Sequence, residues 1–266
     1  LWALAFRPFY LLAALFAALR ERYPKARILT TCPPSTLPLF AGHPWGVEAI
    51  PYNPRHPSTL KGLRSALRGS RPDLALLPGD NRHALLARAC GARWIVGFAN
   101  DAPAWKNRLC DELLPWPETP EALSDIFTHL AGHTPLPYRQ GQWPAPAADR
   151  PHLPAAPYAV LHLGAGNPLR WWAPERWAAL ATALQARGIT PVLTAGPGEE
   201  ELIRAVDPDE CYTAYPGTLS LPAMWHLLAQ AALAVCLDSG IAHLAKLTMT
   251  PTVCLFGQGN DQLFGA

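Results

Sequence analysis

The sequence predicts an α/β protein in which two doubly wound, Rossmann-like domains face a cleft. Short apolar, β-rich runs alternate with helical patterns over residues 1–130, and the same alternation returns over residues 157–266. Residues 131–156 between them are rich in Pro and carry no apolar period, which is typical of a semi-rigid linker. Half of the 266 residues are apolar and only 16% are charged, so both domains have enough apolar side chains to form a core.

The N-terminal domain opens with an apolar stretch. Residues 1–19 are nearly all apolar, apart from Arg7 and Pro8. The uninterrupted run over residues 9–19 is shorter than the roughly 20 residues of a transmembrane helix. We therefore expect a buried first helix that ends at Tyr23. The start of a membrane span and a foreign segment joined to the domain are the alternatives.

The rest of the N-terminal domain follows a strand–helix order, which predicts a parallel sheet. Strands are predicted at residues 26–31, 73–77 and 94–98, and helices at residues 59–68, 83–89 and from residue 120 onward. Thr119 is expected to cap the last helix, with Pro120 at its first position. Gly79, Asp80 and Asn81 form a predicted turn after the second strand, where the Asp80 side chain faces the cleft.

The C-terminal domain repeats this order. Strands are predicted at residues 158–163, 191–195, 233–237 and 251–256, and helices at residues 174–187, from 199, from 221 after the cap Ser220, and at 240–247. Ligands of such sheets bind outside the carboxyl ends of the strands, so the loops at those ends are the candidate site.

Composition excludes several classes of function. The net charge is +2 and the 22 basic residues are spread along the chain, so a nucleic-acid partner is not expected. None of the six cysteines lies in a C-x-x-C pair or at metal-ligand spacing from a histidine, so we expect no metal site and free thiols in a reducing cytoplasm. The chain begins at Leu1 and stops at Ala266 just after a predicted strand, and we interpret it as a piece of a longer protein.

The first motif that indicates chemistry follows the opening strand of the C-terminal domain. Gly164, Ala165 and Gly166 are small, so backbone N–H groups can approach an anion there, and a helix N-terminus favours negative charge. Arg170 adds a charge-assisted donor for a phosphate. An ordinary βα turn with a surface Arg is the alternative. Leu169 takes the position where a dinucleotide fingerprint needs Gly or Ala, so an NAD enzyme is not expected.

The second motif follows the third strand of the same domain. Asp238 ends this strand, and Ser239 and Gly240 open the next helix with free N–H groups. His243 lies one turn further on and faces the same end. The motif predicts a second set of anion-binding groups, with a capped helix and an incidental His as the alternative.

The third motif is acidic. Glu199 and Glu200 follow the second strand and a Gly-Pro-Gly turn. An acidic residue at this place commonly accepts hydrogen bonds from ribose hydroxyls. An acidic first turn that complements the helix dipole is the alternative.

Three segments of the C-terminal domain together resemble glycosyltransferase family 9, the bacterial heptosyltransferases of lipopolysaccharide core assembly. They read "HLGAGNPLRWWAPERWAAL", "VLTAGPGEEELI" and "YPGTLSLPAMWHLLAQAALAVCLDSGIAHLAKLTMTPTVCLFG". The resemblance is strong over residues 157–258. It is weaker over residues 18–100, where "ALRERYPKARI" and "ALLARACGARWIVGF" are similar to family elements.

The resemblance implies a GT-B fold and inverting sugar transfer that needs no metal or other cofactor. The C-terminal domain would hold a nucleoside-diphosphate sugar, often ADP-heptose. The N-terminal domain would face a lipid-linked glycan acceptor. The resemblance also implies a cytoplasmic enzyme, and a lipid-linked acceptor allows peripheral contact with the cytoplasmic face of the inner membrane.

The resemblance also assigns roles by position. Arg170 replaces the family's phosphate-binding Lys, and Glu200, or its neighbour Glu199, binds the ribose. The backbone near Leu219 meets the nucleobase. The remaining groups hold the diphosphate and sugar, with His243 in support: Gly164, Ala165, Gly166, Asp238, Ser239 and Gly240.

One departure from the family concerns the catalytic base. The first strand of family members ends in a Gly-Asp pair whose Asp is the proposed general base, and this pair aligns near Arg7 and Pro8. No Asp occurs before Asp73, so we expect the first strand and its catalytic loop to be missing or replaced, and transfer to be slow. Asp80 is the remaining candidate base, with an ordinary turn residue as the alternative.

Two further classes of function stay open at this point. One is a non-catalytic remnant that binds a sugar nucleotide but has lost its base. The other is a sugar-nucleotide epimerase, which shares the GT-B architecture but carries an acidic set that the sequence does not show.

Overall fold

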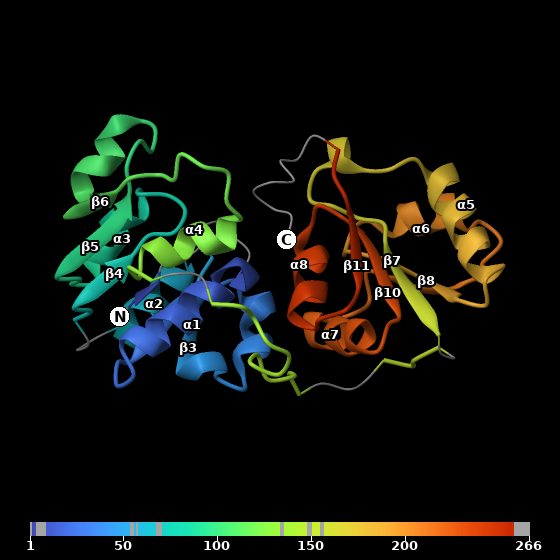
Figure 1. The fold of residues 1–266 in the computed structure, drawn as a ribbon, viewed down its shortest axis with the longest axis horizontal. Helices are drawn as coiled ribbons and strands as arrows, with labels where there is room; N and C mark the ends of the chain where they lie inside the picture. Colours follow the sequence, from blue (N-terminus) through green and yellow to red (C-terminus); the bar gives the residue numbers. More distant parts are fainter. Residues whose placement is uncertain are drawn as a thin grey trace. The chain divides into compact units, whose positions relative to one another are not determined.

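A computed structural model describes residues 2–3, 9–53, 56, 58–67, 71–133, 136–147, 151–154 and 157–257, with the backbone alone for residues 2–3 and 9–10 (Figure 1). The chain divides into two compact units, Leu1–Pro144 (unit 1) and Ala145–Ala266 (unit 2). All strand pairs in the described residues are parallel, so the predicted α/β class is confirmed.

The described residues of unit 1 form a sheet of six strands in the order β3-β2-β1-β4-β5-β6. The strands are β1 (Trp2–Ala3), β2 (Ile28–Cys32), β3 (Val47–Pro51), β4 (Leu74–Leu76), β5 (Trp94–Phe98) and β6 (Glu112–Leu114). The helices are η1 (Phe9–Leu12), α1 (Ala13–Arg22), η2 (Pro34–Phe40), η3 (Pro44–Gly46), α2 (Ser58–Leu67), α3 (His83–Ala89), η4 (Ala104–Leu109) and α4 (Leu123–His129).

Strand β1 lies inside this sheet. Its residue Trp2 is opposite Leu29 of β2 on one side and opposite Ala75 of β4 on the other. A strand therefore fills this place in the sheet, so of the two expected alternatives, a missing or a replaced first strand, only the replaced one stays open. Residues 4–8, which include Arg7 and Pro8, lie outside the described residues.

The first helix forms where the sequence predicts it. The 3-10 turn η1 leads into α1, and Tyr23 is the residue that follows its last turn. Leu15, Phe16 and Leu19 of α1 are buried, and the helix packs against α4. Burial of each such side chain contributes about 1.5–3 kcal/mol. Within the described ranges, no helix has both the length and the apolar character to cross a membrane.

The Pro-rich segment contributes to the packing of unit 1. Trp143 is 1% exposed, and its Nε1 atom donates a 2.8 Å hydrogen bond to the Leu39 carbonyl. Its ring meets the rings of Phe40 and Trp45 edge-on, with centroids 5.1 and 5.8 Å away. The first part of residues 131–156 is thus anchored by an aromatic cluster.

The described residues of unit 2 form a sheet of five strands in the order β11-β10-β7-β8-β9. The strands are β7 (Tyr158–His162), β8 (Thr190–Ala195), β9 (Thr213–Pro216), β10 (Leu233–Leu237) and β11 (Thr252–Leu255). The helices are η5 (Pro168–Arg170), α5 (Pro174–Gln185), α6 (Glu200–Val206), α7 (Leu221–Ala229) and α8 (Gly240–Leu247). A core of apolar residues lies between one face of the central strands and α5 and α6.

The cap predicted for α4 is wrong. The helix begins at Leu123, and the preceding residue Ala122 has extended backbone angles and no capping side chain. The Thr119 hydroxyl instead contacts the Glu121 carboxylate at 3.4 Å. Leu123 and Phe127 are buried against the core, so burial rather than the Thr-Pro signal sets the start of this short helix.

Candidate functional site

The carboxyl ends of β7, β8 and β10 meet at one edge of the unit 2 sheet. Strand β7 pairs with both neighbours, so that His162 lies opposite Thr194 of β8 and Cys236 of β10. The loops that follow these strands carry the three predicted motifs. Because parallel strands present such loops side by side, the fold brings the motifs together at one edge.

An ion pair joins the loop after β7 to the loop after β10. The Arg170 Nη1 atom lies 3.0 Å from the Asp238 Oδ2 atom and donates a 2.9 Å hydrogen bond to the Asp238 backbone carbonyl. The Asp238 side chain is 7% exposed and that of Arg170 is 38% exposed. Oδ2 is close enough for an ion pair but, within the described residues, accepts no hydrogen bond of good geometry. Both contacts engage Nη1, and a guanidinium has further N–H donors that a ligand can use.

Helix α8 begins next to this ion pair. Ser239 precedes it with extended backbone (φ −146°, ψ 173°), and its side chain does not cap the helix. The N–H groups of a first turn have no acceptor inside the helix, and the helix dipole favours an anion there. The Ser239 Oγ atom is buried and has no hydrogen-bond partner in the part of the chain that the structure describes. The helix start therefore offers both N–H groups and a hydroxyl to phosphate or sugar oxygens.

Glu199 and Glu200 take different places after β8. The Glu199 Oε2 atom accepts a 2.9 Å hydrogen bond from the Gly196 N–H and lies so close to Gly164 that a Cβ atom there would come within 1.7 Å of it. The Glu200 Oε1 atom accepts a 2.9 Å hydrogen bond from the Gly198 N–H. This backbone hydrogen bond lowers the pKa of Glu200 below its ordinary value. Glu199 thus connects two loops, whereas Glu200 presents an ionised carboxylate at an exposed position.

His243 and Lys246 lie one turn apart on α8. His243 is buried, and this burial lowers its pKa to about 4, so the imidazole is neutral at pH 7. Burial also lowers the pKa of Lys246. His243 therefore offers no cation to a phosphate.

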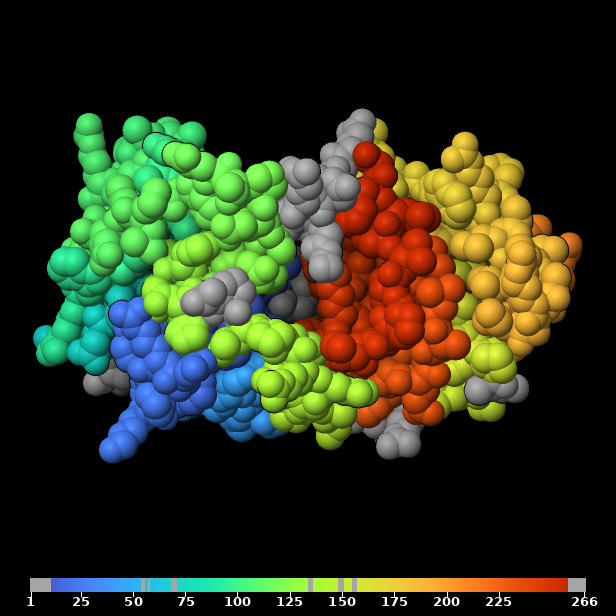
Figure 2. All heavy atoms as spheres, viewed as in Figure 1, coloured from blue at the N-terminus to red at the C-terminus, as the bar shows by residue number. Residues whose placement is uncertain are grey.

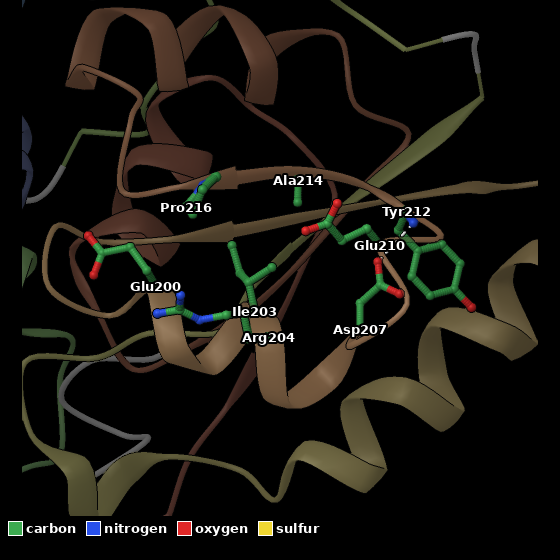
Figure 3. A pocket seen from close by; sticks show the side chains of 8 residues that line it. All are labelled: Glu200, Ile203, Arg204, Asp207, Glu210, Tyr212, Ala214 and Pro216. Carbon is green, nitrogen blue, oxygen red and sulfur yellow. Dashed lines mark hydrogen bonds between the residues drawn. The ribbon is translucent and has the colours of Figure 1, made fainter.

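A groove of about 730 Å³ runs beside this edge, between α6 and β9 (Figure 3). Figure 3 shows Glu200 and Pro216 at one end of the groove and Asp207 and Tyr212 at the other. The Asp207 carboxylate is used by the fold, because it accepts two backbone N–H groups of the loop that follows. Leu219 follows β9 and is half-buried, three positions after Pro216. The Glu200 end of the groove therefore adjoins the predicted nucleobase loop.

Asp80 lies in unit 1, in the loop after β4, and belongs to an ion-pair cluster. Its Oδ2 atom is 2.7 Å from the Arg82 Nη2 atom, and its Oδ1 atom is 3.3 Å from the Lys106 Nζ atom. Burial alone would raise the pKa of Asp80, but hydrogen bonds from Arg82 and Lys106 outweigh it and lower the pKa to about 2. Such a carboxylate is a weak base.

Lys106 is the cation at the centre of this cluster, and the sequence patterns do not single it out. Its side chain is 9% exposed and also lies 3.2 Å from the Asp101 Oδ1 atom. Nearby, the buried Asn81 Nδ2 group donates 2.7 Å hydrogen bonds to the Phe98 carbonyl and to the Asn107 Oδ1 atom. A cation held between two carboxylates from different loops leaves no pattern in the sequence, so only the structure identifies it. Among the described residues, no group of acidic, Cys and His side chains is arranged to hold a metal ion.

The chain is similar to one family and to solved structures. Residues 61–266 match the model of the family described as glycosyltransferase family 9 (heptosyltransferase). Over 274 residues the chain is 25% identical to lipopolysaccharide heptosyltransferase 3 of Escherichia coli. This alignment covers 93% of this chain and 79% of that protein. It superposes on E. coli ADP-heptose lps heptosyltransferase II with a TM-score of 0.77 and 21% identity, covering 98% of this chain and 86% of that one. The E. coli heptosyltransferase WaaC with ADP-2-deoxy-2-fluoro heptose gives a TM-score of 0.76 and 19% identity, covering 97% and 89%. The predicted GT-B fold is confirmed.

Proposed function

Because the chain belongs to glycosyltransferase family 9, we propose that it moves a heptose from ADP-heptose to a lipid-linked glycan of the lipopolysaccharide core. The E. coli relative that matches most of the chain is a lipopolysaccharide heptosyltransferase, and the WaaC structure holds an ADP-heptose analogue. Family membership favours transfer over the epimerase alternative. We place the reaction in the cytoplasm, at the face of the inner membrane where a lipid-linked acceptor is within reach.

The observation that carries this proposal is the position of the Arg170 guanidinium. Asp238 holds it at the start of α8, where the N–H groups of the first turn and the guanidinium together suit a diphosphate. A cation that is already fixed loses little side-chain freedom when the ligand binds. This supports Arg170 as the group that binds the diphosphate of the donor.

The neighbouring loops complete the donor site that we propose. The small residues Gly164, Ala165 and Gly166 let backbone N–H groups approach the phosphates. Ser239 and Gly240 contribute the buried hydroxyl and the helix start, with the neutral His243 packed in support. No step of this binding requires a metal, because the positive charge comes from Arg170 and from the helix dipole.

We propose that Glu200, rather than Glu199, accepts the ribose hydroxyls. Glu199 is engaged between Gly196 and Gly164, whereas Glu200 lines the groove and is ionised. The backbone near Leu219 would then meet the adenine beyond the Glu200 end of the groove.

Asp80 is poorly suited to be the general base. An inverting transfer needs a base that takes the proton of the attacking hydroxyl, and such help contributes about 10²–10⁴-fold in rate. With a pKa near 2 and two cations bound, the Asp80 carboxylate binds a proton weakly. We propose that Asp80 holds Lys106 and Arg82 in place, and that the base comes from elsewhere on the acceptor side.

Calorimetric titration with ADP tests the donor site. Arg170→Ala should weaken ADP binding by about 1.5 kcal/mol, or roughly tenfold, the low end for a charged hydrogen bond because the side chain is partly exposed. Arg170→Lys should retain part of the affinity, because Lys keeps the charge but loses the planar fork. Arg176→Ala, an exposed Arg on α5, is the matched control and should bind ADP like the wild type.

Two outcomes would contradict the proposal. Equal ADP affinity of the wild type and Arg170→Ala would remove Arg170 from the diphosphate site. Turnover is measured separately as ADP release from ADP-heptose in the presence of heptose-deficient lipopolysaccharide. ADP binding without any release would favour the non-catalytic remnant.

A further inference from the structure

Two tryptophans stand exposed at the carboxyl edge of the unit 1 sheet. Trp105 belongs to η4, which follows β5, and Trp116 follows β6 by two residues. They are 45% and 41% exposed. Figure 2 shows the green-coloured loops after β5 and β6 at the surface of unit 1. Large aromatic side chains left in water at one edge of a sheet commonly mark a contact surface.

The Trp116 ring and the loop that carries Trp105 are both held by the fold. The Trp116 ring meets the buried Phe98 ring edge-on, with centroids 5.1 Å apart and an interplanar angle of 70°. The loop that carries Trp105 is fastened by residues before and after it in the chain: Lys106 pairs with Asp101, and the Asn107 side chain accepts from Asn81 and donates to the Asp101 carbonyl. An exposed ring on an anchored loop is preorganised for a ligand, because little freedom is lost when the ligand binds.

The charges around the rings favour a neutral, hydroxyl-rich ligand over a bilayer. The loops after β4, β5 and β6 carry five carboxylates and three cations, a net charge of −2: Asp80, Asp101, Asp111, Glu118 and Glu121 against Arg82, Lys106 and Arg108. A surface that binds anionic lipid is strongly basic, which this edge is not. Alternating acceptors and donors suit sugar hydroxyls, and the negative face of an indole suits the C–H groups of a sugar ring.

From this we infer that Trp105 and Trp116 form a stacking platform for sugar rings of the acceptor glycan. The inference rests on the proposed function, since it names the contact that the acceptor of that reaction makes. The platform is inferred to contact the glycan part of the acceptor rather than its lipid part. A glycan freed of its acyl chains should therefore bind to the platform.

Trp94 provides a matched control within the same sheet. It is 48% exposed, like the platform residues, but it opens β5 and therefore lies at the amino edge. Its Nε1 atom is 3.2 Å from the Glu112 carboxylate, so it too is held by a neighbouring strand. Trp94 thus matches the platform residues in type and closely in exposure, but it lies at the opposite ends of the strands.

Calorimetric titration of the full chain with deacylated core oligosaccharide from lipopolysaccharide tests the inference. Trp105→Ala and Trp116→Ala should each weaken binding by about 3- to 10-fold, the range expected for one aromatic contact. Trp105→Phe should recover part of the affinity, because a phenyl ring keeps a stacking face. Trp94→Ala should bind like the wild type, and all variants should bind ADP with unchanged affinity. Because the tryptophans lie in unit 1 and the proposed ADP site lies in unit 2, an unchanged unfolding transition in calorimetry shows that unit 1 is still folded.

The outcomes separate this inference from the proposed function. Unchanged oligosaccharide affinity in both platform variants, with ADP still bound, overturns the platform alone. If the wild type binds neither ADP nor the oligosaccharide, the proposed function is overturned. Binding of the wild type to vesicles of phosphatidylethanolamine and phosphatidylglycerol that is lost in Trp105→Ala, without oligosaccharide binding, overturns the platform in favour of a membrane contact.

Discussion

Replacing Gly164 with Ala tests the connection between the loops after β7 and β8. A Cβ atom at Gly164 would lie 1.7 Å from the Glu199 Oε2 atom and 2.5 Å from its Cδ atom, far inside contact distance. Because the obstacle is the end of a flexible side chain, the carboxylate can swing away, and it then loses its hydrogen bond from Gly196. Gly166 is the matched control, since a Cβ atom there would meet no atom within 4 Å.

The two substitutions should change stability in opposite directions. A hydrogen bond to a charged acceptor contributes about 1.5–3 kcal/mol, and the low end applies because both groups are partly exposed. The change from Gly to Ala by itself stabilises by about 0.4–1 kcal/mol, through the unfolded chain. Gly164→Ala should therefore lower the free energy of unfolding by about 0.5–1 kcal/mol, and Gly166→Ala should raise it by about 0.4–1 kcal/mol.

Scanning calorimetry measures the gap between the two variants. A difference of about 1–2 kcal/mol corresponds to about 2–8 °C in Tm for a chain of this size. Adding Glu199→Ala removes the obstacle, so in that background Gly164→Ala should no longer destabilise. Equal Tm values for Gly164→Ala and Gly166→Ala would refute the contact between Glu199 and Gly164.

The remaining predictions concern two buried groups. Burial lowers the pKa of His162 from 6.5 to about 4, so the unfolded chain takes up a proton first and stability falls as the pH drops from 6.5 toward 4. His162→Gln keeps a partner for the Thr194 hydroxyl. Between pH 7 and pH 5, the free energy of unfolding of this variant should fall by about 1–2 kcal/mol less than that of the wild type. If calorimetry gives the same pH dependence for both proteins, His162 is not a buried neutral side chain. Lys106→Met leaves Asp80 and Asp101 without their shared cation and should lower the free energy of unfolding by about 1–3 kcal/mol, with ADP affinity unchanged. An unaltered unfolding transition would contradict the ion-pair cluster.

The sequence predicts the inner strands of both sheets except β1, and it misses several edge strands. Strands β7, β8 and β10 are nearly continuous apolar runs, because both of their faces are covered. Strands β3, β6 and β9 lie at sheet edges and are only partly buried, so their residues carry no comparable pattern. β11 is also an edge strand, yet its apolar run is predicted from the sequence.

The site shows the same division between local and tertiary information. The motifs around Gly164, Glu200 and Asp238 are predicted because each directly follows a strand, and the parallel order then implies that their loops converge. The contacts among them are not predictable in this way. Arg170 and Asp238 are 68 positions apart, and nothing local to either residue indicates that one holds the other. The same is true of Lys106 and Asp80, which are 26 positions apart.

The order of strands in unit 2 has a consequence for how the protein is made. Strand β7 emerges from the ribosome first, yet it ends in the middle of the sheet, between β8 and the much later β10. Pairing of β7 with β8 can begin early, whereas its pairing with β10 must wait until residue 237 has been synthesised. The ion pair between Arg170 and Asp238 links the loops that follow these two strands, so it also forms only after β10 has been synthesised. A nascent chain that lacks β10 therefore also lacks part of the proposed donor site. A nucleotide bound between the loops after β7 and β10 would stabilise the chains in which the sheet is complete.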